Sequence, residues 1–506
     1  MESMPNQTNL LFILTDDQGY WSMGCSGNSE IRTPNLDRLA ETGLRFDNFF
    51  CASPVCSPAR ASILTGQIPS QHGVQDFLRG GNTSIYKGEA SGSANFVQDD
   101  QGIEYLAGLT AYTDLLSKAG YNCGLSGKWH LGYSEKPQTS FEFWDVHAFG
   151  GGPYYNPPMI RDGKPYHSNE YASDLFTGNA LNFLEAQKDS DQPFCLNVHH
   201  TAPHAPWGRE HHPKDLFDDY YENCPFESTP NGPIHPQHIA TRADTATTSQ
   251  YPTEWRKESL SGYFSAMTAM DANVGRLLDW LEENGERENT LVVFTSDNGM
   301  NMGHHGIYGK GNSTFPVNMY DTSVKVPTLI SQPGRVPQSK VISTLHSHYD
   351  IMPTLLEYLG VENTESETLP GRSFSALLEG QGLEGDDHVV VFDEYGPTRM
   401  VRTTDWKYVH RYPFGPHELY DLVRDPDEEI NLIEKEKHQK IQEELQVKLD
   451  TFFVRYADPQ RDGSREAVTG RGQIDIVGPA AKGKKRFPQD VFTEADRAKG
   501  KERRKM

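Results

Sequence analysis

Largely apolar runs of strand length recur along the chain and alternate with stretches of helical periodicity. The runs cover residues 9–15, 193–199 and 290–295. Runs of this kind are typical of parallel strands covered on both faces. Residues 109–119 and the stretch from Tyr263 repeat apolar residues at the three- and four-residue spacing of amphipathic helices. The pattern therefore predicts an α/β protein with a mostly parallel central sheet flanked by helices.

Two further helices are indicated by residues that favour helix ends. Thr33 and Pro34 suit the cap and first turn of a helix that stops at Gly43. Pro58 suits the first position of a short helix that stops at Gly66. Cys56 would then lie just before the second helix, facing its free backbone N–H groups.

The last quarter of the chain predicts a smaller unit. Residues 379–387 are rich in glycine and acids, and strands are expected at 389–392 and 406–410, followed by a helix at 438–456. We expect a large domain over residues 1–385 and a smaller α+β domain with a short antiparallel sheet over 386–460. Basic residues cluster in 461–506, where apolar residues are few, so a loosely packed tail is expected there.

Oxygen ligands follow two of the predicted strands. Asp16 and Asp17 end the first run, and Asp297 and Asn298 follow the run at 290–295. A single acid there is more often a cap or a turn residue, but paired acids repel each other unless a cation lies between them. Hard oxygen donors favour calcium or magnesium over zinc, so one such ion is expected.

Charge and composition limit the kinds of molecule that the protein is expected to bind. The net charge of −23 argues against nucleic acid or an anionic membrane as the main partner. The six cysteines show neither a disulfide framework nor a zinc-binding spacing, and no stretch could span a bilayer. As given, the chain is expected to be cytoplasmic, or periplasmic or secreted if a leader was removed. The oligomeric state stays open.

Three motifs carry a family resemblance. They are Cys56-Ser57-Pro58-Ala59-Arg60 with Thr65-Gly66, then Gly127-Lys128-Trp129-His130-Leu131-Gly132, then Ala202-Pro203-His204-Ala205-Pro206-Trp207. A lone cysteine is more often a small buried hydrophobe. Together and in this order, however, the motifs resemble those of the type I sulfatases, which have an alkaline-phosphatase-like fold. Residues 310–320 and 415–422 are similar to bacterial sulfatases that act on carbohydrate sulfates.

The resemblance implies roles residue by residue. It implies that Cys56 is oxidised to formylglycine by a formylglycine-generating or anaerobic maturation enzyme. Asp16, Asp17, Asp297 and Asn298 would bind Ca²⁺, or Mg²⁺, together with position 56. Arg60 would steady the modified residue, and Lys128 would contact both that residue and sulfate. His130 would be the base, and His204 and Lys310 would hold sulfate and assist departure of the alcohol.

The implied reaction is hydrolysis of a sulfate monoester, with a sulfated carbohydrate as the substrate. One hydroxyl of the hydrated aldehyde attacks sulfur and displaces the alcohol. The second lets the adduct collapse, with release of inorganic sulfate. Arg60, Lys128 and Lys310 make the charge of the site positive enough for an anion.

Four other residues are predicted to contact substrate. His72 and Arg79 lie in a polar stretch over residues 67–101, expected to be a long surface loop. Trp207 is the last residue of the third motif, and His305 lies shortly before Lys310. Residues 209–256, with weak periodicity, are expected to be an insertion over the active-site face.

Two other functions stay open. The first is a phosphonate monoester or phosphodiester hydrolase of the same superfamily. A two-zinc phosphatase of the related alkaline phosphatase fold is not expected, because it would need a histidine where Asn298 stands. The second is a pseudoenzyme that binds sulfated glycans without cleaving them, if Cys56 is not oxidised. Comparing turnover of a sulfate ester and of a phosphate diester of the same phenol distinguishes a sulfatase from the first alternative. The mass of the peptide around position 56 shows a thiol or an aldehyde and so distinguishes a sulfatase from the second.

Overall fold

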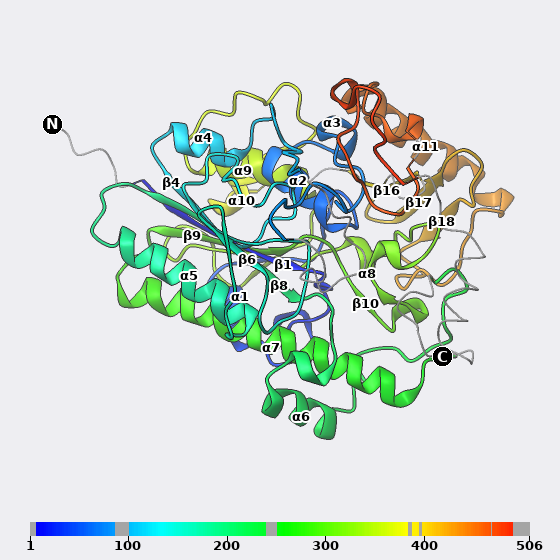
Figure 1. Ribbon diagram of the computed structural model, residues 1–506. Coiled ribbons are helices and arrows are strands. Elements are labelled where there is room, and N and C mark those ends of the chain that lie inside the picture. The colour runs from blue at the N-terminus through cyan, green and yellow to red at the C-terminus, as the bar shows by residue number, and fades with distance from the viewer. Residues whose placement is uncertain are drawn as a thin grey trace.

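A computed structural model describes residues 7–86, 101–238, 250–382, 387–393, 397–466 and 468–488 (Figure 1). A large layered unit with a central sheet and a smaller unit beside it are both visible. The predicted boundary at residue 385 lies outside the described residues, so the division of the chain there stays a prediction.

The central sheet has ten strands in the order β13-β2-β12-β9-β1-β8-β4-β5-β6-β7. The five middle strands, from β9 to β5, are parallel to one another, and antiparallel pairs flank them. The strands are, in chain order, β1 (Asn9–Asp16), β2 (Leu44–Phe46), β4 (Asn122–Lys128), β5 (Phe143–His147), β6 (Met159–Arg161), β7 (Lys164–Tyr166), β8 (Phe194–Pro203), β9 (Thr290–Ser296), β12 (Thr328–Ser331) and β13 (Lys340–Ile342). The predicted α/β fold with a mostly parallel sheet is confirmed.

Strand β1 lies at the centre of the sheet and is buried along its whole length. Leu10, Phe12 and Leu14 pack into one hydrophobic cluster, and Leu11 and Ile13 pack into the other. Because successive side chains of a strand point to opposite faces, this alternation places a core on each side of the sheet.

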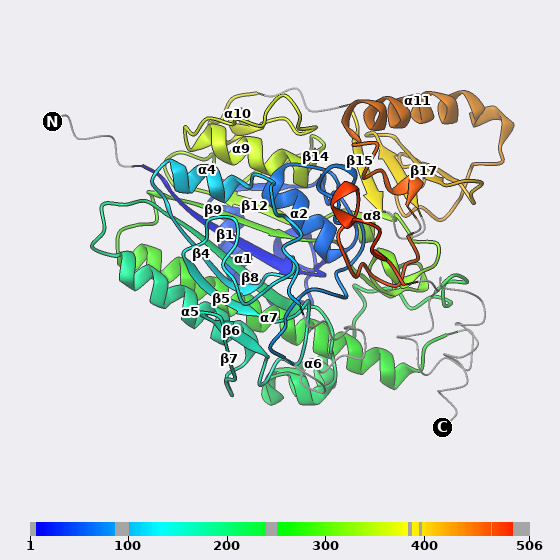
Figure 2. The same ribbon diagram turned by 45° about the horizontal axis from the view of Figure 1, so that its top comes forward.

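Helices cover both faces (Figure 2). On one side lie α1 (Pro34–Glu41), α5 (Ala172–Gln187), α6 (Lys214–Asn223) and α7 (Thr253–Glu283). On the other lie α2 (Cys56–Thr65), α4 (Tyr112–Lys118), α9 (Ile351–Tyr358) and α10 (Ser375–Leu378). None of the described helices combines the length and the apolar character that crossing a membrane requires.

The smaller unit is a four-stranded antiparallel sheet with one long helix. The sheet consists of β15 (Val389–Asp393), β16 (Thr398–Arg402), β17 (Trp406–Arg411) and β18 (Glu418–Asp421). Helix α11 (Gln439–Tyr456) packs on it through Leu445, Leu449 and Phe453. The remaining short strands and α-helices are β3 (Phe49–Phe50), α3 (Pro69–His72), β10 (Asn301–Met302), β11 (Tyr308–Gly309), α8 (Asp321–Val324) and β14 (His346–Ser347).

The ends of the early helices differ from the prediction. The Thr33 hydroxyl does not cap α1, because it accepts a hydrogen bond from the Gly24 amide (2.8 Å). The Asp271 carboxylate, on α7, accepts from the Leu36 amide instead (2.8 Å). Helix α2 begins at Cys56 itself, two residues earlier than Pro58, so the cysteine lies within the first turn.

Three segments predicted to be irregular are more ordered than expected. Part of 67–101 forms α3, and residues 87–100 of that stretch lie outside the described residues. Part of 209–256 forms α6, which packs against α7, while 239–249 also lie outside. Residues 461–488, expected to be a loosely packed tail, make backbone hydrogen bonds to residues 73–80 and are largely described.

Candidate active site

The carboxyl ends of the central parallel strands bring the predicted site residues to one edge of the sheet. Asp16 ends β1, Lys128 ends β4, and Asp297 follows β9. His204 follows β8, whose last residue, Pro203, pairs with Asp16. Ligands bind at this edge of open α/β sheets, so the fold itself concentrates these side chains there.

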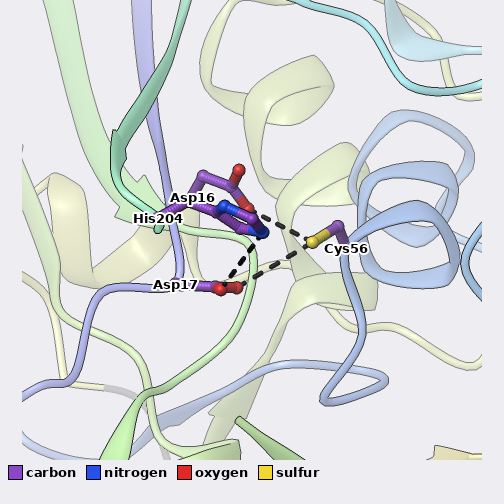
Figure 3. A group of neighbouring side chains, drawn as sticks. All are labelled: Asp16, Asp17, Cys56 and His204. Atoms are coloured by element: carbon purple, nitrogen blue, oxygen red, sulfur yellow. Dashed lines mark hydrogen bonds and ion pairs between the residues drawn. The ribbon is translucent and has the colours of Figure 1, made fainter. Parts of the chain in front are cut away.

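Cys56 enters the cluster from α2 rather than from the sheet (Figure 3). Its Sγ lies 3.2 Å from Asp16 Oδ1 and 3.9 Å from Asp17 Oδ1. The Lys310 Nζ lies 2.5 Å from the same sulfur. Burial, followed by the charge of Asp16, raises the pKa of the Cys56 thiol well above its ordinary value. The cysteine side chain is therefore a neutral thiol and not a ready nucleophile.

Asp17 lies at the centre of the cluster in a left-handed backbone conformation, with a φ of 63°. Its amide donates to Asp297 Oδ1 (3.2 Å), and its Oδ1 accepts from the Asn298 side-chain amide (2.9 Å). A non-glycine residue in this region is strained and needs surrounding contacts to hold it. These contacts connect the ends of β1 and β9.

Each of the three carboxylates has its own basic partner. Lys128 Nζ lies 2.5 Å from Asp16, Lys310 Nζ lies 2.6 Å from Asp17, and Arg60 Nε lies 2.9 Å from Asp297. All six side chains are buried, where unpaired charges are costly. Although burial opposes ionisation, Lys310 and His204 hold the pKa of Asp17 well below its usual range.

The cluster also fits a metal ion. Asp16, Asp17, Cys56 and His204 each offer one ligand atom, and these atoms lie within 4.8 Å of one another. Asp17 Oδ2 and Asn298 Oδ1 are buried and accept no hydrogen bond from a described residue. Buried oxygens without a donor are unfavourable unless a cation meets them. The predicted ligands thus lie together, with His204 adjoining them.

The two predicted catalytic histidines are held by backbone carbonyl groups. His130, with a φ of 55°, donates from Nε2 to the Leu78 carbonyl (3.1 Å). His204 donates from Nδ1 to the Ala205 carbonyl (2.7 Å), which leaves Nε2 3.6 Å from Asp17 Oδ2. Burial, then the charge of Lys128, lowers the pKa of His130 well below its ordinary value. His130 is thus a neutral imidazole.

A run of three glycines lies against the histidines, and the sequence analysis missed it. A Cβ added at Gly150 would lie 2.1 Å from the His130 ring, and one at Gly151 would lie 3.2 Å from the His204 ring. At Gly152 it would lie 2.9 Å from the His147 ring. Three consecutive glycines were the available signal, because glycine permits close approach of the backbone to another group.

The four residues predicted to bind substrate have other contacts in the described structure. His72 is 3% exposed, and its ring hydrogen-bonds with Ser62 of α2. The remaining three contact neighbouring segments: Arg79 donates to the Arg471 carbonyl, Trp207 donates to the Pro203 carbonyl, and the His305 ring stacks on Tyr320. The roles of all four residues in substrate binding stay predictions.

An α/β fold with a compact group of acids and cations at the strand ends offers a site for a cation and for an anionic ligand. A model of the sulfatase family matches residues 8–361, and one of the N-sulphoglucosamine sulphohydrolase C-terminal region matches residues 303–454. The chain belongs to the sulfatase family and is a sulfuric ester hydrolase.

Individual relatives agree with this assignment. An N-acetylglucosamine-6-O-sulfatase of Bacteroides thetaiotaomicron is 30% identical, over 93% of this chain and 90% of the relative. An ulvan-active sulfatase of Formosa agariphila is 29% identical, over 90% of this chain and 82% of the relative. A solved structure of a protein in complex with its substrate D-glucosamine-2-N,6-O-disulfate superposes with a TM-score of 0.71 at 27% identity, covering 91% of this chain and all of that one.

Proposed function

We propose that this protein hydrolyses a sulfate monoester on a carbohydrate, and that position 56 acts as the nucleophile after oxidation of Cys56 to formylglycine. The observation that carries the proposal is the position of Cys56 in the first turn of α2, between Asp16 and Lys310. The relatives support the substrate class, because one acts on N-acetylglucosamine 6-sulfate groups and one is active on ulvan.

An unmodified thiol fits this site poorly. It is buried, its pKa is raised, and thiolate is a soft ligand beside hard oxygen donors. A hydrated aldehyde at position 56 would instead present hydroxyl oxygens to the same neighbours. The N-terminal amides of α2 and the ammonium groups of Lys128 and Lys310 would then face the sulfate oxygens.

Asp16, Asp17, Asp297 and Asn298 would hold one Ca²⁺ or Mg²⁺. When bound, such a cation would make the attacking hydroxyl more acidic and offset the charge of the carboxylates. Arg60 orients Asp297, to which it is paired, and also donates to the Lys128 carbonyl (3.1 Å). Arg60 thus fixes the end of β9, at Asp297, relative to the end of β4, at Lys128.

The reacting bonds are those around sulfur. An oxygen on position 56 attacks sulfur, and the bond from sulfur to the alcohol oxygen breaks. The alcohol takes up a proton on the side of His204 and Lys310. Neutral His130 then accepts the proton of the second hydroxyl on position 56, while the bond from carbon to the sulfate oxygen breaks. Sulfate is released, position 56 becomes an aldehyde, and water hydrates it again.

Replacement of the nucleophile tests the proposal. Cys56→Ala should lower release of sulfate from a sulfated sugar at least about a thousandfold, because the attacking group is lost. Cys195→Ala is the matched control, since Cys195 is equally buried but pairs with Leu10 near the other end of β1. The mass of the peptide around position 56 should show the aldehyde in active wild-type protein.

The substrate class is tested in parallel. A panel of sulfated mono- and oligosaccharides, together with a phosphate diester of a phenol and its sulfate ester, should show turnover of sulfate esters and preference for sugars. Substantial turnover by Cys56→Ala, or preference for the phosphate diester, would contradict the proposal.

Removal of the metal ion gives an independent prediction. Incubation with a chelator should lower both activity and the melting temperature, since an ion that binds only the native state stabilises it. Added Ca²⁺ or Mg²⁺ should restore both. If neither property responds to chelation and readdition, the assignment of Asp16, Asp17, Asp297 and Asn298 as metal ligands is wrong.

A further inference from the structure

We infer that residues 468–477, here called the C-terminal strap, position His130 by fixing the carbonyl group of Leu78. Gln473 would be the central positioning residue. The inference rests on the proposed function, in which His130 accepts a proton at position 56. In Figure 1 the segment that contains the strap runs beside α3.

The Leu78 carbonyl is the contact that orients the His130 ring. It accepts a hydrogen bond from Nε2 at 3.1 Å, which fixes Nε2 as the protonated nitrogen and Nδ1 as the proton acceptor. His130 itself follows β4, whereas Leu78 belongs to a different segment, residues 73–80. The orientation of a catalytic ring thus depends on how firmly that segment is held.

Residues 74–80 form no helix and no extended ladder, so their backbone needs partners from elsewhere. The strap supplies them. The Gln473 carbonyl accepts from the amides of Arg79 (2.8 Å) and Gly80 (3.2 Å), and the Gln473 amide donates to the Phe77 carbonyl (2.8 Å). Leu78 is therefore held on both sides through the residues next to it.

The Gln473 side chain makes further hydrogen bonds between the strap and the 73–80 segment. It is 0% exposed, and its Oε1 accepts from the Gln75 amide (2.8 Å). Its Nε2 donates to the carbonyl groups of Gly73 (3.1 Å) and Asp475 (3.0 Å). One side chain thus joins the start of the 73–80 segment to the strap with its hydrogen-bonding groups satisfied, an arrangement that makes a polar contact rigid.

A second side chain and α2 complete the support. Asp76 Oδ2 accepts from the Gly472 amide (3.0 Å), so the strap is also held at the residue before Gln473. The Leu78 amide donates to the Ser57 hydroxyl (3.1 Å), which is next to Cys56. Leu78 therefore connects the strap, the catalytic ring and the first turn of α2.

The strap acts through His130, so its disturbance should lower the rate of turnover more than substrate affinity. Gln473→Met keeps the size of the side chain and removes its hydrogen bonds, while Gln473→Asn keeps the amide one methylene shorter. We expect kcat to fall roughly ten- to a hundredfold in Gln473→Met and less in Gln473→Asn, with KM within about threefold of wild type.

Gln332→Met is the matched control. Gln332 is also buried, donates to the Glu288 carbonyl (2.8 Å) and accepts from Tyr358 (2.8 Å), outside the active site. It should lower the melting temperature and leave kcat within about twofold.

Hydrogen exchange supplies a readout that does not depend on turnover. In purified Gln473→Met, the amides of peptides covering residues 73–80 should exchange faster than in wild type, and in Gln332→Met they should not. A rise in KM with unchanged kcat, or a loss of kcat without faster exchange at 73–80, would overturn the inference. If wild-type protein itself released no sulfate, the proposed function would fail, whereas active wild type with unaffected Gln473 variants would refute only the role of the strap.

Discussion

At the scale of single residues, the site is organised by pairing. Asp16, Asp17 and Asp297 each face a different cation, and none of these six groups is open to solvent. A buried carboxylate that loses its partner becomes unfavourable by several kcal/mol. The cations therefore stabilise the acids in the folded chain, and under the proposed function they would also supply the positive charge that an anionic substrate needs.

Gly150 gives a prediction at this scale. Gly150→Ala should lower kcat roughly ten- to a hundredfold, because the added carbon would lie 2.1 Å from the His130 ring and force it to move. Gly178→Ala is the control, since nothing lies within 4 Å of a carbon added there, on α5. Steady-state kinetics and melting temperatures of the two variants check this. Equal kcat in both variants would show that the ring tolerates the displacement.

At the scale of secondary-structure elements, contacts distant in sequence replace local signals. The cap expected from Thr33 comes instead from Asp271 on α7, and the support of Leu78 comes from Gln473. The strap had no sequence signature, because it is held by backbone hydrogen bonds and one buried amide rather than by a periodic apolar face. Strands β1 and β9 could be predicted, because the central side chains of each, at 10–14 and 291–294, are apolar and alternate between two cores.

The candidate site, like the fold, could be predicted in part from the sequence. Its acids follow apolar strands, and strand ends converge at one edge of a parallel sheet, so Asp16 and Asp297 were expected to meet. The contact of Gly150 with His130 and the hydrogen bond between His72 and Ser62 depend on how loops cross in space. The hydrophobic periodicity of the sequence does not predict which loops cross.

Asp76 makes the contact between strap and loop sensitive to pH. Burial raises the pKa of its carboxyl to about 7, despite hydrogen bonds from the Phe77 and Gly472 amides. The unfolded value is about 4, so the native state binds the extra proton between these values. The stabilisation is fully present below pH 4, is lost as the pH rises through 7, and amounts to at most about 4 kcal/mol.

The measurement compares wild type with Asp76→Asn. Relative to the variant, the melting temperature of wild type should fall as the pH rises from 5 to 8, because the variant has no proton to lose there. The absolute difference between the proteins is not diagnostic, since the substitution also alters a hydrogen bond. Parallel profiles over that range would mean that Asp76 does not titrate there.

At the scale of the whole molecule, the two units are joined by buried charges. Lys407 on β17 contacts Asp321 on α8, Glu428 and the Met319 carbonyl, and Arg402 on β16 contacts Asp321 as well. Asp321 and Glu428 are almost fully buried, and therefore depend on these cations. The smaller sheet is thus anchored to the segment that follows Lys310.

Lys407→Met should destabilise the protein by about 3–5 kcal/mol, since it leaves two buried carboxylates with one cation fewer. Lys440→Met is the control, because Lys440 is 88% exposed and its pair with Glu444 is a weak surface contact. Denaturant unfolding of both variants tests the difference. A change below about 1 kcal/mol for Lys407→Met would show that the charges do not hold the units together.

The strap also sets an order of events during synthesis. Gln75 and Gln473 are 398 positions apart, so a ribosome must make most of the chain before they can meet. Cys56 has by then been outside the ribosome for most of translation, and it is nearly inaccessible once folding is complete. An enzyme that oxidises this residue would therefore find its target on the nascent chain. Because the strap is synthesised late, the 73–80 segment that supports His130 is held in place only after the period in which Cys56 is accessible on the nascent chain.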